Sequence, residues 1–343
     1  MRLDPALGAV NLPADPPAPL KAVLRQQIEE PRAERALAAG LRRLRPVQDP
    51  TSRAVQAQYE ENPYPRWTRC GLGEPAALRD VVGAALPHLP LRELPTVASP
   101  RVLIAGCGTG LETMRVVTSY RGASVIALDL SRASLAYGAR KLAEYGVENV
   151  ELVHGDILDV TQLGEPFDLI ESFGVVHHMA DPERGLAELR KVLKPGGLMR
   201  LGLYSEIARA GVVAARARIA ERGHAADASG IRRLRREIMT DGHLAPDLRG
   251  LLSPVSDFWT TSDCRDLLFH VEEHRFTLQQ IDEMISRLGM TFLGMDLRHG
   301  ADLLRFRAEF PAADSLRSLR DWHAFEQRHP ITFGETYRFW LRG

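Results

Sequence analysis

Val102-Leu-Ile-Ala-Gly-Cys-Gly-Thr-Gly110 is the stretch that decides the fold of this chain. Its four leading apolar residues predict a strand buried on both faces, as in a parallel sheet. Gly106, Gly108 and Gly110 follow in a G-x-G-x-G spacing, which lets the chain turn tightly and lets its backbone approach a ligand. Because a helical pattern starts at Leu111, the turn opens onto the free N–H groups of a helix N-terminus. The stretch predicts a site for a nucleotide-like ligand, and a glycine turn without a ligand is the alternative.

The glycine spacing narrows the choice of ligand. A dinucleotide fingerprint needs its third glycine at Leu111, and a P-loop needs Gly-Lys followed by Ser or Thr, so neither motif is present. The next predicted strand, 123–129, ends in Asp129, whose carboxylate can accept hydrogen bonds from both ribose hydroxyls. An N-cap of the following helix, made together with Ser131, is the alternative role for Asp129. The glycine motif followed by this acid resembles the first motif of class I S-adenosylmethionine (SAM) methyltransferases.

Composition excludes several other classes. The chain has 343 residues, enough for one large domain or a domain with a sizeable insertion. Its formal net charge is zero, so no global field favours nucleic acid or an anionic membrane. No apolar run reaches membrane-spanning length, and prolines break the N-terminus where a signal peptide would have an apolar core. Cys70, Cys107 and Cys264 lie far apart without a CxxC pair, so we expect reduced thiols in a cytoplasmic protein.

The order of the following elements extends the resemblance over about residues 98–205. Strands are expected at 150–156, 167–172 and 198–204, and strands that alternate with helices at short intervals imply a parallel sheet. The motifs that carry the resemblance are Phe167-Asp168, His177-His178, Asp181-Pro182 and Leu193-Lys-Pro-Gly-Gly197. The resemblance implies an α/β fold with a doubly wound, seven-stranded, mostly parallel, Rossmann-like sheet. Its last strand, 336–341, is then antiparallel and inserted beside the fifth.

The chain is expected to divide into four parts, with further helices and one strand between the motifs. The parts are an N-terminal helical extension at 1–97 with a lid at 58–67, a SAM-binding core at 98–205, a helical substrate-cap insertion at 206–275, and a C-terminal completion of the sheet at 276–343. Proline and alanine over 1–19 predict an extended or disordered start. Helices are expected at 20–45, 51–61, 75–90, 209–238, 277–288 and 313–328, and a strand at 290–297.

The lid prediction rests on the aromatic string Gln58-Tyr-Glu-Glu-Asn-Pro-Tyr-Pro-Arg-Trp67. Its two prolines force an extended path. A packing plug between subdomains is the alternative to a lid over the cofactor or substrate. The string resembles the N-terminal signature of bacterial SAM methyltransferase domains that are often fused behind tetratricopeptide repeats, which this chain lacks.

The resemblance implies a set of cofactor-binding residues. Asp156 is expected to hydrogen-bond the adenine amino group and Ile157 to pack on the adenine face. Family members often carry an acid two residues before the first glycine, where this chain has Ile104; backbone carbonyls or the Tyr64–Arg66 part of the lid then have to hold the methionyl amine. The full expected set is Gly106, Cys107, Gly108, Gly110, Asp129, Leu130, Asp156, Ile157, Ser172, Phe173, Tyr64 and Arg66.

Candidate catalytic residues follow from the chemistry of methyl transfer. The reaction is an in-line displacement, so the protein must align the acceptor and exclude water, and it adds a base when the acceptor carries a proton. His177 and His178 follow the fourth expected strand and are the first candidates; Tyr59, Tyr204 and His270 are the next. His270-x-x-Glu-His274 matches an inverted zincin pattern, but Thr277-x-x-Gln280 starts a new helix at once, so we expect no metal there.

Elimination narrows the acceptor to an oxygen or nitrogen of a small molecule or peptide. Methylation of an unactivated carbon needs a cluster-binding cysteine set, and metal-assisted catechol methylation needs more acids than Asp168 and Glu171. Nucleic acid favours a net basic chain. Two alternatives stay open: an RNA or protein methyltransferase that uses the arginine-rich stretch 209–238, otherwise a solvated face, and a non-catalytic SAM-binding scaffold.

Overall fold

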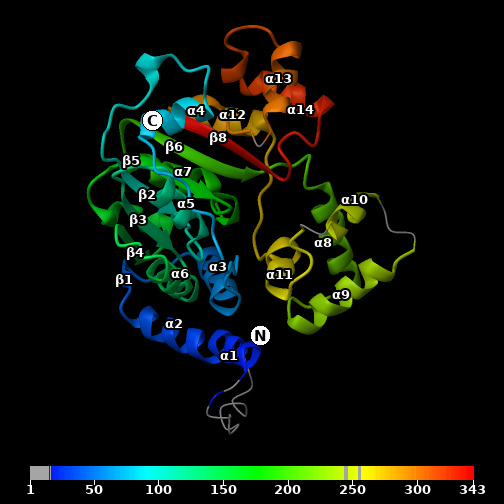
Figure 1. Ribbon diagram of the computed structural model, residues 1–343. Helices are drawn as coiled ribbons and strands as arrows, with labels where there is room; N and C mark the ends of the chain where they lie inside the picture. The colour runs from blue at the N-terminus through cyan, green and yellow to red at the C-terminus, as the bar shows by residue number, and fades with distance from the viewer. Residues whose placement is uncertain (1–14, 16, 243–245, 254–255, 298) are drawn as a thin grey trace.

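An eight-stranded sheet forms the centre of the computed structural model, which describes residues 15, 17–242, 246–253, 256–297 and 299–343 (Figure 1). The strand order is β1-β4-β3-β2-β5-β6-β8-β7. β8 pairs antiparallel with both β6 and β7, and the other pairs are parallel. The strands are β1 (Arg42–Arg43), β2 (Arg101–Ala105), β3 (Ser124–Asp129), β4 (Val150–His154), β5 (Phe167–Phe173), β6 (Leu193–Tyr204), β7 (Thr291–Met295) and β8 (Thr336–Arg342).

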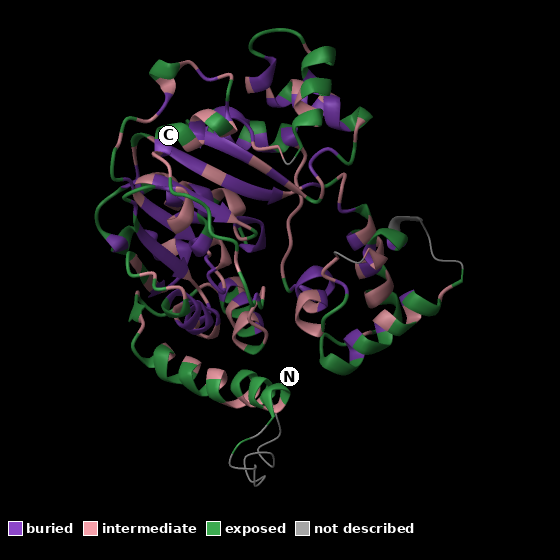
Figure 2. Cartoon of the chain, viewed as in Figure 1, coloured by how far each residue is buried: buried purple, intermediate pink, exposed green. Residues whose placement is uncertain are grey.

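Alternation along the central strands explains why helices cover both faces of the sheet. On β2, Leu103 belongs to one apolar cluster, whereas Val102 and Ile104 belong to the other. α4 (Leu78–Ala85), α5 (Leu111–Ser119) and α6 (Arg132–Glu144) contribute to the second cluster. The first cluster takes α7 (Pro182–Lys191), α12 (Leu278–Arg287), α13 (Gly300–Glu309) and α14 (Leu319–Arg328). The doubly wound, mostly parallel sheet with an antiparallel strand beside the fifth expected one is therefore confirmed, and Figure 2 shows it buried between the helices.

The N-terminal extension differs from the sequence prediction. In place of a helix over 20–45, the chain forms α1 (Ala18–Leu24), a π-helical turn (Arg25–Glu29), α2 (Glu30–Ala39) and the short strand β1. The helix ends at Gly40, and β1 then pairs with β4, which adds an eighth strand to the predicted seven. α3 (Pro50–Glu61) matches its prediction and leads into the lid segment. The expectation for 1–19 falls largely outside the described residues.

The described residues of the stretch 210–269 form a helical unit with an apolar cluster of its own. The predicted helix over 209–238 is broken into α8 (Ala210–Arg222) and α9 (Ala228–Thr240), because Gly223 ends the first in a left-handed conformation and Asp227 caps the second. α10 (Pro246–Arg249) and α11 (Thr261–Phe269) complete the unit. Figure 1 shows it beside the sheet, with α11 next to α3. Its cluster includes Val212, Ile231, Leu234, Phe258, Cys264 and Leu268.

Candidate cofactor and acceptor site

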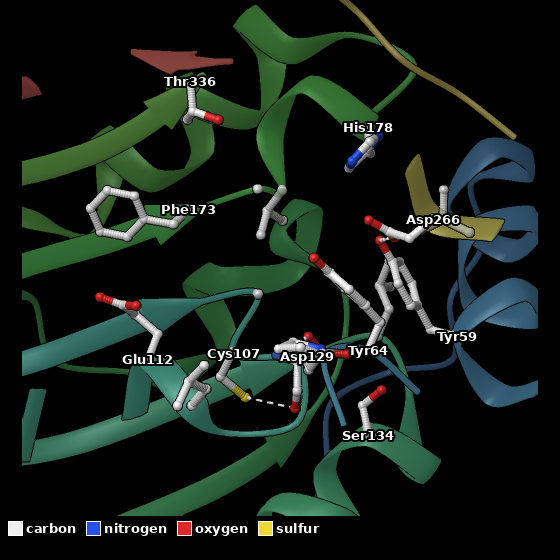
Figure 3. A pocket seen from close by; sticks show the side chains of 18 of the residues that line it. Tyr59, Tyr64, Cys107, Glu112, Asp129, Ser134, Phe173, His178, Asp266 and Thr336 are labelled. Atoms are coloured by element: carbon white, nitrogen blue, oxygen red, sulfur yellow. Dashed lines mark hydrogen bonds between the residues drawn. The ribbon is translucent and has the colours of Figure 1, made fainter. Parts of the chain in front are cut away.

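A cavity of about 500 Å³ lies where the carboxyl ends of the parallel strands meet α3 and α11. Its size is that of a site for a small organic ligand. Its wall comes from segments far apart in the sequence, among them the glycine turn, the ends of β3 and β4, the lid, the loop after β5 and the helical unit (Figure 3). The predicted site residues that line it are Tyr59, Tyr64, Gly106, Cys107, Gly108, Asp129, Leu130, Asp156, Ile157, Phe173, His178 and Tyr204.

The glycine turn has the geometry that its sequence predicts. Gly106, Gly108 and Gly110 all have positive φ angles, of 82°, 52° and 83°. A Cβ on Gly106 would lie 2.2 Å from Cγ2 of Val175, and one on Gly108 would lie 3.1 Å from the Tyr64 carbonyl oxygen. The loop after β5 and the lid therefore both approach the turn closely. Gly110 lies outside the cavity lining and packs against helix α6 at Gly138.

Asp129 lies at the end of β3 in the cavity wall. One carboxylate oxygen accepts the Gly108 N–H at 2.7 Å, and the other accepts the Ser131 N–H at 2.8 Å. Burial raises the pKa of this carboxyl to about 6, against the opposing effect of the two N–H groups. The alternative prediction for Asp129 was an N-cap of α6 made together with Ser131. In the structure Ser131 is the N-cap residue, and its hydroxyl accepts from the Ser134 N–H.

Asp156 and Ile157 line the cavity in the loop that follows β4. Asp156 caps a short 3₁₀ helix by accepting the Leu158 N–H at 3.0 Å. Burial raises its pKa, while that hydrogen bond and the Ser52 hydroxyl act in the other direction. Ser52 lies on α3, so the helix before the lid also borders this end.

Two other predicted cofactor contacts lie outside the cavity. The Ser172 hydroxyl donates to the Ala105 carbonyl, which ties β5 to β2 within the buried sheet. Arg66 is exposed, and its guanidinium lies 5.4 Å from the centre of the Tyr137 ring. The lid contacts the cavity through Tyr59, Tyr64 and Pro65 instead.

His178 is the histidine of the predicted pair that reaches the cavity (Figure 3). Its Nδ1 lies 2.6 Å from the Glu272 carbonyl oxygen, which can only accept, so Nδ1 carries the proton and Nε2 is left as an acceptor. Burial holds the pKa of His178 well below its usual range. The ring is therefore neutral at neutral pH.

His177 points elsewhere. It is buried outside the cavity lining and stacks on Tyr204 with ring centres 3.7 Å apart. Burial holds its pKa well below the usual range, with Arg209 adding to the effect. Arg209 covers Tyr204, its guanidinium carbon 3.7 Å from the ring centre. The sequence analysis did not single out Arg209, which lines the cavity although it is almost wholly buried.

Two tyrosine–aspartate pairs close the cavity on the side of the helical unit. The Tyr59 hydroxyl donates to Asp266 at 2.6 Å, and the Tyr64 hydroxyl donates to Asp257 at 2.7 Å. His270 lies behind the first pair: it is outside the lining but 3.2 Å from the Tyr59 hydroxyl. The sequence analysis missed both aspartates. The sequence contains one signal that could have indicated Asp266: it is an acidic residue directly before the apolar run Leu267-Leu-Phe269 on a helix.

The inverted zincin pattern is not formed. α11 ends at Phe269, and His270 already has extended backbone angles, so no single helix carries His270 and His274. The segment after His270 crosses from α11 to the sheet, where Phe276 forms a bridge with Ser205.

Comparisons with known proteins identify the family. A family model described as "Methyltransferase domain" matches residues 102–197, which span the glycine turn, Asp129, Asp156 and His178. An uncharacterised protein of Synechococcus sp. is 30% identical over 308 residues, covering 81% of this chain and 68% of that protein. The chain belongs to the class I SAM-dependent methyltransferases.

One curated relative matches the core of this methyltransferase, and one solved structure shares its fold. A demethylmenaquinone methyltransferase of Clavibacter sepedonicus is 40% identical over 107 residues, 31% of this chain and 42% of that protein. PKMT2 of Rickettsia typhi, solved with AdoHcy, superposes with a TM-score of 0.58 at 16% identity and shares the fold, over 81% of this chain and 54% of that chain. The methyltransferase thus spans about half the length of these two proteins. None of the helices described in the structure combines the length and apolar character that crossing a bilayer requires.

Proposed function

We propose that this methyltransferase transfers the methyl group of SAM to an oxygen or nitrogen of a small molecule or peptide held between the lid, His178 and the helical unit. The observation that carries the proposal is that His178 and the glycine turn line one cavity. A group that binds the cofactor and a group that contacts the acceptor must share one space for an in-line displacement.

The residues of the cavity fit SAM. Gly106 and Gly108, both with positive φ, let the backbone of the turn approach the ligand, and a Cβ at Gly106 would collide with Val175. Asp129 would accept hydrogen bonds from the ribose hydroxyls, and Asp156 from the adenine amino group, beside Leu130 and Ile157. When bound, SAM supplies a methyl group activated by a sulfonium. We propose both the class of the acceptor and these contacts of individual residues with the cofactor.

The alternative that uses the arginine-rich stretch has less support. Arg232, Arg233 and Arg236 of α9 are exposed and do not line the cavity. They flank the buried residues Ile231 and Leu234, which is the pattern of an amphipathic helix with a solvated face. A cytoplasmic location and the kinship with repeat-fused methyltransferase domains stay predictions of the sequence.

The experiment is a methyl-transfer screen with isotope-labelled SAM against fractionated metabolites and peptides. His178→Ala should lower turnover of the acceptor so found roughly 10²- to 10⁴-fold and leave SAM affinity nearly intact. His299→Ala, at an exposed position outside the cavity, is the control and should match the unchanged protein. Full activity in His177→Ala, His178→Ala and the double variant would exclude this loop as the source of a base.

A further inference from the structure

We propose that the acceptor group is a protonated amine, and that Asp266 binds this amine and takes its proton before methyl transfer. This inference rests on the proposed function and names its substrate class. It assigns a catalytic residue on α11 and a positioning role to Tyr59 and His270.

A directed chain of hydrogen bonds ends on Asp266. The Glu272 N–H donates to Nδ1 of His270 at 3.2 Å, so Nδ1 carries no proton and Nε2 does. Nε2 then donates to the Tyr59 hydroxyl oxygen at 3.2 Å. This leaves the Tyr59 proton for Asp266, which accepts it at 2.6 Å. Every member of the chain donates toward the carboxylate, which stabilises its ionised form and fixes its orientation.

The carboxylates on this side of the cavity lack cationic partners. In the described parts of the chain, no salt bridge reaches Asp266 or Asp257, and tyrosine hydroxyls are the partners given above. Arg209, whose charge lowers the pKa of Asp266, also lines the cavity, but its guanidinium is already held by Glu273 at 3.0 Å and Glu335 at 2.6 Å. A buried carboxylate needs a counter-charge, and a bound ammonium supplies one.

The aromatic groups of the wall also suit a cation. Tyr59 and Tyr64 line the cavity on the same side as Asp266, as Figure 3 shows. The faces of aromatic rings attract ammonium groups. An alcohol or a phenol would leave the buried Asp266 carboxylate without a counter-charge, so the wall discriminates in favour of an amine.

Asp266 is also better placed to take a proton than His178. Burial raises the pKa of Asp266 to about 7, although the Tyr59 hydrogen bond lowers it, whereas burial holds the pKa of His178 well below its usual range. The protonated carboxyl is therefore accessible at neutral pH, and the protonated imidazole is not. His178 keeps an acceptor nitrogen with which to orient the neutral amine.

The step balances as follows. An N–H bond of the ammonium breaks and its proton passes to the Asp266 carboxylate, leaving a lone pair on nitrogen. That lone pair forms a bond to the methyl carbon of SAM while the carbon–sulfur bond breaks, and the electron pair of that bond stays on sulfur as the thioether of S-adenosylhomocysteine. The product nitrogen carries the positive charge, and Asp266 returns its proton to solvent.

The test compares benzylamine with benzyl alcohol, which share a ring and differ in the charged group. The full chain is saturated with S-adenosylhomocysteine and titrated with each probe by calorimetry near neutral pH. Benzylamine should bind, and Asp266→Asn should weaken its binding about 10- to 100-fold without changing the affinity for benzyl alcohol or S-adenosylhomocysteine. Asp282→Asn, at an exposed position of α12 outside the cavity lining, is the matched control and should behave as the unchanged protein.

The pH dependence of benzylamine binding by Tyr59→Phe distinguishes a positioning role of Tyr59 from a purely structural role. Benzylamine binding should weaken as pH falls through the pKa of Asp266, because protonation removes the negative charge. The charges that face Asp266 are Asp257 and Asp263, which raise its pKa, and Arg209, which lowers it. Tyr59→Phe removes the hydrogen bond that lowers this pKa and leaves these charges in place, so the midpoint should move to higher pH, while Asp282→Asn leaves it unchanged.

Three results would overturn the inference and leave the proposed function standing: equal binding of the two probes, unchanged benzylamine affinity in Asp266→Asn, or no benzylamine binding by protein that binds S-adenosylhomocysteine. Failure to bind S-adenosylhomocysteine would instead overturn the proposed function, and this inference with it.

Discussion

Asp129 combines two backbone hydrogen bonds with a position in the cavity wall, and burial raises its pKa to about 6. Below that pH the carboxyl is protonated and loses much of its capacity to accept hydrogen bonds from a ribose. We expect the affinity for S-adenosylhomocysteine to fall as pH decreases through about 6. Asp129→Asn should bind about 1–3 kcal/mol more weakly and show no such step, measured by calorimetry over a pH series. An equal step in the variant would assign the titration to another group, such as Asp156.

Gly106 is required by space as well as by conformation. An alanine there has a left-handed φ of 82° and a Cβ that would lie 2.2 Å from Cγ2 of Val175. Gly223 offers a matched control, since it has left-handed angles, with a φ of 63°, and nothing lies within 4 Å of its Cβ position. Gly223→Ala should lose about 1–2 kcal/mol of unfolding free energy from backbone strain alone. Gly106→Ala should lose clearly more in denaturant titrations; equal losses would show that the loop after β5 moves aside without cost.

At the scale of elements, the segment 58–67 joins α3 to both sides of the cavity. Tyr64 reaches Asp257 on the helical unit, and the Trp67 ring N–H donates to the Thr109 carbonyl of the glycine turn at 3.0 Å. We expect S-adenosylhomocysteine to slow amide hydrogen exchange over 58–67, because a ligand beneath the segment restricts its opening. α14 lies outside the cavity lining and serves as the internal reference. Exchange unchanged by the ligand would contradict a lid.

The elements that the sequence predicts best are those with a strong local pattern. β2, with its apolar run and glycines, and α12, with the Thr277–Gln280 capping box, lie where expected. β1 was missed because two arginines carry no strand period, and their pairing with β4 depends on contacts more than 100 residues away. α13 was missed because its stretch has only a weak amphipathic pattern.

The candidate site likewise has one side that local sequence patterns predict and one side that they do not. The side proposed for the cofactor follows from motifs in consecutive strands and turns, so the sequence predicted that Gly106, Asp129 and Asp156 would lie at one edge of the sheet, where they line the cavity. Its acceptor side depends on the packing of the helical unit, which brings Asp266 to Tyr59 across 207 positions of the sequence. No spacing rule anticipates that contact. The sequence could not distinguish the roles of the neighbours His177 and His178 for the same reason, because packing sets them apart. His178 lines the cavity, whereas His177 stacks on Tyr204.

At the scale of the whole molecule, a buried charge cluster connects the helical unit to the sheet. Arg209, just before α8, pairs with Glu273 in the crossing segment and with Glu335 just before β8. The side chains of Arg209 and Glu273 are 2% and 1% exposed. Segments from three regions of the chain thus meet at one guanidinium, next to the cavity that the helical unit and the sheet enclose.

This cluster yields a prediction for the stability of the whole chain. Arg209→Met leaves Glu273 buried with the more distant Arg275 and Arg216, at 3.3 and 3.8 Å, so it should lower the free energy of unfolding by about 3 kcal/mol. Glu273→Gln should cost less in the double variant than alone, because the carboxylate is harmful once its partner is gone. Denaturant unfolding of both single variants and the double variant gives the coupling, expected at about 1–3 kcal/mol. Additive losses would mean that Arg275 and Arg216 already neutralise Glu273, and that Arg209 connects the helical unit to the sheet through Glu335 and the Tyr204 ring instead.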